Sequence, residues 1–476
     1  MTKPSQETFT RSLITKPVLR LTMSSWGKIL AFMLVASFLT SLVMFQPIHA
    51  NANSASDDWP MFQHDLSHTG YSTSAAPLTN QSLWSFAAFD SGSMSPASVA
   101  NGIVYVGGNT NLYAINAANE LLLWNYTGAP VNFGFSISAP AVANGIVYAG
   151  NGDGDLYAFD ALTGSVSWVY KTVSGGIGSP SVANGIVYIG SGDFNVYALN
   201  ATIGTVIWNY TTGDQVYSSP ALVNGTLYIS SYDGNVYALN AKDGTVIWKF
   251  LAYPSNPKVE VAIPTSPAIA DGIVYVGSPN DNVYALNASS GAQLWSYTTG
   301  GGVSCPAVAN GVVYVGSADG NVYALNAATG ALTWIYSCGS PVGSSLAVSN
   351  GMVYVCSNLY HFPQNLGSTG TLCGLNAATG KNIWSFSTQE ASLSFPVIAG
   401  NVLYISSGDG QVYAFGVPST QTPSPSLTST PSQTTSPSPS PTPSVPEFPP
   451  LTIPILLILM ASTGLLVYFK KHKRNN

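Results

Sequence analysis

Residues 179–208 read SPSVANGIVYIGSGDFNVYALNATIGTVIW. Apolar residues alternate along two short runs, 186–190 and 196–200, and turn residues at Asn184-Gly185 and Asp193-Phe194 separate them from their neighbours. This alternation is typical of short antiparallel strands joined as hairpins. Similar units recur along the chain, so we expect a repeated blade of four strands.

Tryptophan marks the repeat most clearly. The spacings between successive tryptophans of the body are 40, 44, 40, 40, 47, 39 and 50 residues. These tryptophans are Trp84, Trp124, Trp168, Trp208, Trp248, Trp295, Trp334 and Trp384. A period near 40 residues with many Tyr, Val and Ile residues favours propeller blades over helical repeats.

One part of the repeat has constant length. Ala198, Asn200, Gly204 and Trp208 lie at offsets 0, 2, 6 and 10, and this docking run recurs in seven places. Glu120 replaces the glycine in the first run and Gly374 replaces the alanine in the last. A fixed offset inside a variable repeat predicts a packed unit. We expect the flat indole to lie against the backbone of the next blade, where small residues make room.

This pattern resembles the tryptophan-docking motif of the PQQ-type quinoprotein propellers and their non-enzymatic relatives. The first tryptophan has no docking run before it, and the last tyrosine strand, around Tyr413, has no tryptophan after it. Joining the two completes a blade. We therefore expect an all-β, eight-bladed propeller of four-stranded antiparallel blades, with the last blade closed by the N-terminal strand. A seven-bladed ring with a loose end is the alternative.

The chain ends predict export and anchoring. Residues 1–50 have a polar leader followed by an uncharged apolar run, as in a signal peptide with an unusually long leading region; an uncleaved membrane anchor is the alternative. The propeller is expected over 51–416, and a Ser/Thr/Pro-rich stalk over 417–450. Residues 451–469 are long and apolar enough to span a bilayer, and 470–476 form a basic tail expected to stay cytoplasmic.

The residues before that apolar run, Val445-Pro446-Glu447-Phe448-Pro449, resemble the PEF-type carboxy-terminal sorting signal of archaeal surface proteins. The resemblance implies that a sortase removes the tail and attaches the protein to the surface. A plain transmembrane anchor predicts the same location. Either way, we expect the body to lie on the extracellular face, anchored to the membrane or surface.

Charge excludes one class of partner. Charged residues make up 7% of the chain, and residues 51–416 contain no arginine, five lysines and eighteen acidic residues. Neutralising nucleic-acid phosphates requires clustered Lys and Arg, so we expect no nucleic-acid binding.

The equivalent positions in other blades indicate which of the four cysteines lie opposite each other. In a hairpin, the numbers of two facing residues have a constant sum that the turn fixes. Counted from the Asp-Gly turns, this sum places a small residue opposite tyrosine in most blades. In the seventh blade, Cys356 and Cys373 hold these two places. Directly opposed strand residues and an oxidising location together predict a disulfide between them. Cys305 and Cys338 lie near the entries to successive inner strands, and the sequence leaves their pairing open.

Loop lengths indicate which end of the ring binds a partner. Length variation is concentrated in 125–138, 251–264 and 357–371, which all map to one end of an up-and-down ring. Long loops on a rigid scaffold are common binding sites, although tolerated insertions without a partner are equally compatible. The binding candidates are Phe133, Phe135, Tyr253, Lys258, Glu260, Tyr360 and His361.

Two segments show weak metal-site patterns. His64, Asp65 and His68 could ligate a metal if they lay on a helix. Similar segments at the start of the folded body are common in propellers of the family that this chain resembles, and there they look structural. Asp153 and Asp155 suggest a calcium loop, but they lie where every blade has a turn. We therefore predict no metal site.

The sequence favours binding over catalysis. Quinoprotein dehydrogenases are known for adjacent cysteines, a calcium ion and an Asp base, and none of these residues can be transferred to positions here. We expect no cofactor and a non-catalytic propeller that binds an envelope protein or a glycan. The alternative is a PQQ-dependent dehydrogenase. An assembly scaffold like the outer-membrane assembly propeller is a third possibility, but that protein is lipid-anchored at its amino terminus.

Overall fold

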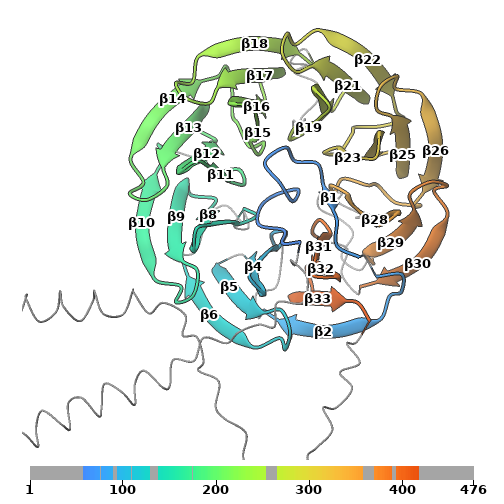
Figure 1. The fold of residues 1–476 in the computed structure, drawn as a ribbon, viewed down its shortest axis with the longest axis horizontal. Helices are drawn as coiled ribbons and strands as arrows, with labels where there is room; N and C mark the ends of the chain where they lie inside the picture. Colours follow the sequence, from blue (N-terminus) through green and yellow to red (C-terminus); the bar gives the residue numbers. More distant parts are fainter. Residues whose placement is uncertain are drawn as a thin grey trace, which may run out of the picture. The chain divides into compact units, whose positions relative to one another are not determined.

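The structure is a computed structural model that describes residues 57–417, except 76, 89–93, 109, 129–137, 174, 254–264, 358–368 and 389–392. The chain divides into two compact units, residues 1–418 and 419–476, and the described residues lie in the first. They form eight four-stranded antiparallel blades around a common axis (Figure 1). This confirms the eight-bladed ring and rules out the seven-bladed alternative. In this described part, no helix is long and apolar enough to cross a bilayer.

Each blade runs from a short strand at the axis to a longer strand at the rim. The innermost strands are β3 (Ser98–Ala100), β7 (Ala141–Ala143), β11 (Ser181–Ala183), β15 (Ala221–Val223), β19 (Ala268–Ala270), β23 (Ala307–Ala309), β27 (Ala347–Ser349) and β31 (Val397–Ala399). The second strands are β4 (Ile103–Gly107), β8 (Ile146–Gly150), β12 (Ile186–Gly190), β16 (Thr226–Ser230), β20 (Ile273–Gly277), β24 (Val312–Gly316), β28 (Met352–Ser357) and β32 (Val402–Ser406).

The third strands are β5 (Asn111–Asn116), β9 (Asp155–Asp160), β13 (Asn195–Asn200), β17 (Asn235–Asn240), β21 (Asn282–Asn287), β25 (Asn321–Asn326), β29 (Thr371–Asn376) and β33 (Gln411–Phe415). The outer strands are β6 (Leu122–Thr127), β10 (Val166–Lys171), β14 (Val206–Thr211), β18 (Val246–Leu251), β22 (Gln293–Thr298), β26 (Leu332–Ser337), β30 (Asn382–Ser387) and β2 (Ser82–Ala87). A further short strand, β1 (Tyr71–Ser72), pairs with β27 in parallel.

The docking run has a simple local explanation. Asn200 accepts hydrogen bonds from the backbone N–H groups of Thr202 and Ile203 through its side-chain oxygen, which folds the turn after β13. Gly204 has φ 70°, a left-handed conformation that favours glycine. A β-bulge then shifts the register, so that Trp208 lies opposite Ala198.

Each indole packs against the next blade. Trp208 Nε1 donates to the Ala241 carbonyl at 2.9 Å, and a Cβ atom on Gly244 would lie 2.6 Å from the Trp208 ring. Indole-to-carbonyl bonds of this kind also join Trp84 to Ala117, Trp124 to Ala161, Trp168 to Ala201, Trp248 to Ala288, Trp295 to Ala327 and Trp334 to Ala377. The hydrophobic clusters accordingly lie between neighbouring blades.

Both ends of the described chain build the last blade. β2 pairs with β33, although more than 300 residues separate them in the sequence. Trp384 Nε1 and the Tyr354 hydroxyl both donate to the Pro77 carbonyl just before β2, so this carbonyl replaces the missing alanine carbonyl. The predicted closure by the N-terminal strand is confirmed.

The predicted opposition of Cys356 and Cys373 is wrong. Cys356 faces Leu372, whereas Cys373 faces Val355, so the two thiols lie on opposite faces of the sheet. The predicted pairing is also wrong in other blades, because the turn between the second and third strands contains one residue more than a two-residue loop. Gly316, for example, faces Val322, and Gly320 in this turn has the left-handed conformation. All four cysteines are free thiols. Cys305 accepts a hydrogen bond from Ser266 N, and Cys338 packs against the cluster that contains Cys373.

Candidate functional site

The two ends of the ring have different structures. Because the strands alternate in direction, the Asn-Gly turns and the docking runs lie at one end, here called the docking end. The turns between the second and third strands lie at the other, here called the second-turn end. The described bases of the long loops lie at the second-turn end, where Gly128 N donates to Thr110 O and Tyr253 N donates to Gly234 O.

Of the predicted binding residues, Tyr253 lies within the described part of the chain, and its side chain is buried. It is 7% exposed, packs between two blades and donates its hydroxyl to Ser231 O at 3.3 Å. Its carbonyl would lie 1.9 Å from a Cβ atom on Gly234, which explains the glycine there. Phe133, Phe135, Lys258, Glu260, Tyr360 and His361 lie outside the described residues.

The central channel is occupied by residues 57–75, here called the axial segment (Figure 1). It supplies backbone carbonyls to the N–H groups of the innermost strands in chain order: Trp59 to Val99, Pro60 to Val142, Leu66 to Leu222, Ser67 to Ile269, Thr69 to Val308 and Gly70 to Val348. Innermost strands expose unpaired N–H groups, so these bonds cover six free sheet edges. The two other blades are contacted through side chains: His68 Nε2 lies 3.3 Å from Ser181 Oγ, and Phe62 packs edge-on against Phe395.

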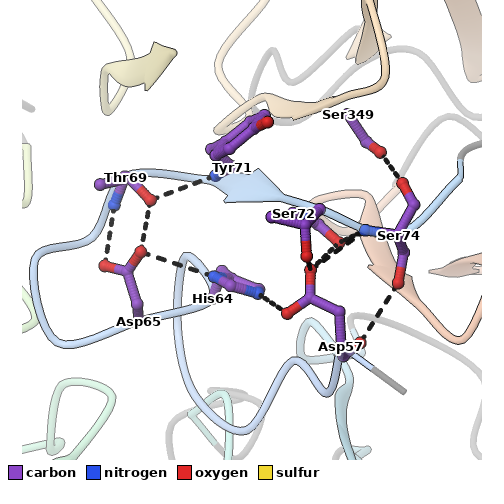
Figure 2. A network of polar contacts seen from close by, with 9 residues as sticks. Asp57, His64, Asp65, Thr69, Tyr71, Ser72, Ser74 and Ser349 are labelled. Atoms are coloured by element: carbon purple, nitrogen blue, oxygen red, sulfur yellow. Dashed lines mark hydrogen bonds and ion pairs between the residues drawn. The ribbon is translucent and has the colours of Figure 1, made fainter. Parts of the chain in front are cut away.

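A polar network folds the axial segment upon itself (Figure 2). His64 lies between two carboxylates, with Nε2 3.0 Å from Asp57 and Nδ1 3.5 Å from Asp65. Burial lowers the pKa of His64, but the hydrogen bond to Asp65 and the charge of Asp57 outweigh it and raise the pKa above 6.5. Burial raises the pKa of Asp57, but hydrogen bonds from Ser72 and the charge of His64 lower it to about 2.

His68 is separate from that network. It is fully buried, and burial lowers its pKa to about 4. The charge of Asp65 and the backbone of Pro267 act in the opposite direction and are outweighed by burial. His64 and His68 therefore do not converge on one point. No group of three or more metal-ligating side chains occurs in the described part of the chain.

The residues of the weak calcium-loop pattern make contacts within the fold. Asp155 pairs with Lys171 at 2.8 Å, and the Asn151 side-chain oxygen accepts hydrogen bonds from the backbone of the nearby turn.

Carboxylates at the second-turn end connect neighbouring blades. Asp193 accepts hydrogen bonds from the Tyr197 hydroxyl at 2.7 Å and from Val173 N of the preceding blade at 3.2 Å. Asp233 and Asp319 make the same two kinds of bond. These aspartates are structural, because their oxygens are used within the ring.

Sequence reasoning missed three aromatic residues at this end. Phe194 is 42% exposed, and Tyr217 and Tyr232 are half-buried with ring centroids 5.6 Å apart. Phe194 stands in a turn where four other blades have glycine: Gly154, Gly234, Gly320 and Gly410. The presence of Phe194 in place of this glycine is the sequence signal that could have identified these aromatic residues.

The fold is therefore a closed propeller of the tryptophan-docking class. The sequence profile described as outer membrane protein assembly factor BamB matches residues 71–176, 171–302 and 298–415. The chain belongs to this family. No curated protein matches the chain by sequence.

Similar solved structures include an assembly factor, an enzyme and a designed protein. BamB from Moraxella catarrhalis is 19% identical with a TM-score of 0.58, covering 71% of this chain and 99% of that one. Quinohemoprotein alcohol dehydrogenase from Comamonas testosteroni is 16% identical with a TM-score of 0.61, covering 76% and 81%. The computationally designed Ika8 protein is 17% identical with a TM-score of 0.61, covering 71% and 100%. At these identities the likeness shows the fold alone.

We tested whether the axis suits the quinone cofactor of the dehydrogenases. Beside the axial segment lies a small cavity of about 10 Å³, enough for about one water molecule. Its lining consists of Trp59, Phe62, Gln63, Pro96, Ala97, Ser345, Leu346, Phe395, Pro396 and Val397. PQQ carries several carboxylates, and buried carboxylates require cationic or multiple hydrogen-bonding partners. A lining without a charged side chain does not fit that cofactor.

Proposed function

We propose that this protein is a surface-displayed, non-catalytic propeller that binds another component of the cell envelope through its second-turn end. The observation that carries the proposal is the axial segment, which bonds to six innermost strands and contacts the other two blades. Both ends of that segment bond to turns of the docking end, Asp58 to Asn101 and Ala75 to Asn401, so a ligand approaching the axis from this end would have to displace it. The second-turn end carries the bases of the long loops and the exposed side chain of Phe194.

Family membership supports a binding role. The matching family is described as an assembly factor, and BamB from Moraxella catarrhalis is similar over nearly its whole length. The apolar segments and Ser/Thr/Pro-rich stalk of the sequence support display outside the membrane, whether by a sorting signal or by a transmembrane anchor. The partner is an envelope protein or a glycan.

Cofactor reconstitution tests the proposal against the dehydrogenase alternative. The purified protein is mixed with PQQ and calcium, separated from free cofactor, and assayed for quinone absorbance and alcohol-dependent dye reduction. We expect neither signal. Stoichiometric bound quinone with alcohol-dependent turnover would overturn the non-catalytic reading.

A second experiment tests display and binding together. The tagged chain is crosslinked in native envelopes, and accessibility of the propeller to protease added from outside is measured in parallel. We expect protease access and a crosslinked partner attached at the second-turn end. Crosslinks confined to the docking end would contradict the assignment of the binding end.

A further inference from the structure

Phe194 has an unfavourable backbone conformation for its residue type. Its φ is 75°, and the equivalent glycines of four other blades have φ values from 79° to 90°. A bulky residue rarely adopts this left-handed conformation, and such strain is concentrated at functional sites. The ring is 42% exposed, so its burial does not compensate for the strain. An exposed, strained aromatic residue points to a role outside the fold.

Two tyrosines lie close to this turn. A Cβ atom on Gly192 would lie 2.6 Å from the Tyr217 hydroxyl, so Tyr217 covers the turn that carries Phe194. Tyr232 comes from the corresponding turn of the next blade, and its N–H donates to Gln215 O at 2.9 Å. The two rings pack edge to face, with centroids 5.6 Å apart and an interplanar angle of 89°.

The surroundings of these rings are acidic. Burial and, to a lesser extent, the charge of Asp214 raise the pKa of both tyrosines, and Asp214 Oδ1 accepts a hydrogen bond from Gln215 N at 2.7 Å. Lys171, on the outer strand of the preceding blade, is already paired with Asp155. Residues 51–416 contain eighteen acidic residues and five lysines. Aromatic faces beside a carboxylate attract cations.

We propose that Phe194, Tyr217, Tyr232 and Asp214, together the aromatic corner, receive a lysine or arginine side chain of a partner protein. The inference rests on the proposed function and gives the chemistry of the partner at the second-turn end. The ring faces would bind the cation and its aliphatic stem, and the carboxylate would supply charge complementarity.

Peptide binding to the full chain in detergent tests the proposal. The probes are a fluorescent peptide of alternating lysine and glycine, the same peptide with norleucine for lysine, and the neutral oligosaccharide maltoheptaose. We expect the lysine peptide to bind at least about tenfold more tightly than the norleucine peptide, with affinity falling as salt rises. Equal binding of the two peptides, or binding of maltoheptaose alone, would overturn the proposal.

Phe194→Gly separates binding from folding. The variant restores the glycine of the other blades, so it should raise the melting temperature by about 1–2 °C while weakening lysine-peptide binding about tenfold. Phe194→Tyr should keep the affinity within about twofold, and Asp214→Asn should weaken binding about fivefold and reduce its salt dependence. Unchanged peptide affinity in Phe194→Gly would refute the assigned role of the ring.

Asp281→Gly is the matched control. Asp281 holds the same turn position in the fifth blade with φ 69°, so this variant makes the same exchange for glycine at a left-handed position without removing an aromatic ring. It should raise the melting temperature and leave lysine-peptide affinity unchanged. An equal loss of affinity in Asp281→Gly would show that turn strain, and not the aromatic corner, governs binding. The PQQ assay is independent of these results, so failure of the corner and failure of the non-catalytic function remain distinguishable.

Discussion

At the scale of single residues, His64 and His68 experience opposite electrostatic environments four positions apart. The pKa of His64 is raised, so its protonated form stabilises the fold; that stabilisation is complete below about pH 6.5 and is lost as the pH rises through the folded-state pKa. The pKa of His68 is lowered to about 4, so its neutral form is favoured; that stabilisation is present above about pH 6.5 and is lost as the pH falls toward 4.

The predicted result is a stability maximum near pH 6.5 from these two groups. His68→Gln should flatten the acid side between pH 4.5 and 6.5, where the wild type loses on the order of 2–3 kcal/mol. His64→Gln should flatten the alkaline side instead. Urea unfolding at a series of pH values measures both, and each variant is the control for the other. Parallel pH profiles in all three proteins would contradict this assignment.

The docking tryptophans make the largest single-residue contribution that we predict. Trp208 is 8% exposed and packs on Gly244, so Trp208→Ala should cost about 3–5 kcal/mol as a large core truncation. Trp208→Phe keeps much of the packing and removes the bond to Ala241, so it should cost about 1–2 kcal/mol. Denaturant unfolding measures the difference. An unchanged midpoint in Trp208→Ala would show that the indole does not join the blades.

At the scale of elements, the axial segment depends on one carboxylate. Asp57 accepts hydrogen bonds from the hydroxyls of Ser72 and Thr73 and from the backbone of Ser74. Asp57→Ala should therefore lower the free energy of unfolding by about 2–3 kcal/mol and increase hydrogen exchange in Val142, Leu222 and Val348, whose N–H groups bond to this segment.

Asp271→Asn is the control for that substitution. Asp271 lies in an exposed turn at the docking end, in the place that Asn occupies in most blades. Its replacement removes a carboxylate without disturbing the axial segment, so stability should change by less than about 0.5 kcal/mol. If both variants lost stability equally, the loss would reflect charge at this end and not the Asp57 network.

The elements also show which parts of the structure the sequence predicts. The docking run was predictable, because residues that keep the same spacing in every repeat make the same packing contacts. In the structure, the small residues of the run lie against an indole, as Ala198 and Gly204 show. The tyrosine of the second strand was missed: Tyr188 donates its hydroxyl to the Ala241 carbonyl that also accepts Trp208 Nε1. Tyrosine is common in strands, so repetition alone does not distinguish this bond from ordinary packing.

Strand register and tertiary contacts were harder to predict from the sequence. The pairing of Cys356 was inferred from other blades, and an Asp-Gly pair does not determine how many residues their turns contain. The axial segment bonds through backbone carbonyls, which leave no pattern in side-chain identity. The aromatic corner combines residues of two blades, and its sequence signal was only the exchange of glycine for Phe194.

At the scale of the whole molecule, residues 57–87 stabilise the ring in two ways. β2 supplies the outer strand of the last blade, and the axial segment contacts all eight blades at the axis. In an open repeat array each unit touches only its neighbours, so its cooperativity is local. Here one N-terminal stretch is bonded to blades along the whole described chain, which predicts a single cooperative transition.

Truncation tests that prediction. A variant lacking residues 57–87 loses the β2–β33 pairing and the carbonyl partners of six innermost strands, so its melting temperature should fall by about 10 °C or more and its unfolding should broaden. Hydrogen exchange should become fast first in β31 to β33, which lose their outer strand. Removing residues 419–476, a separate compact unit, should leave the transition unchanged. A sharp, unshifted transition in the first variant would mean that the seven complete blades hold the ring together without its N-terminal stretch.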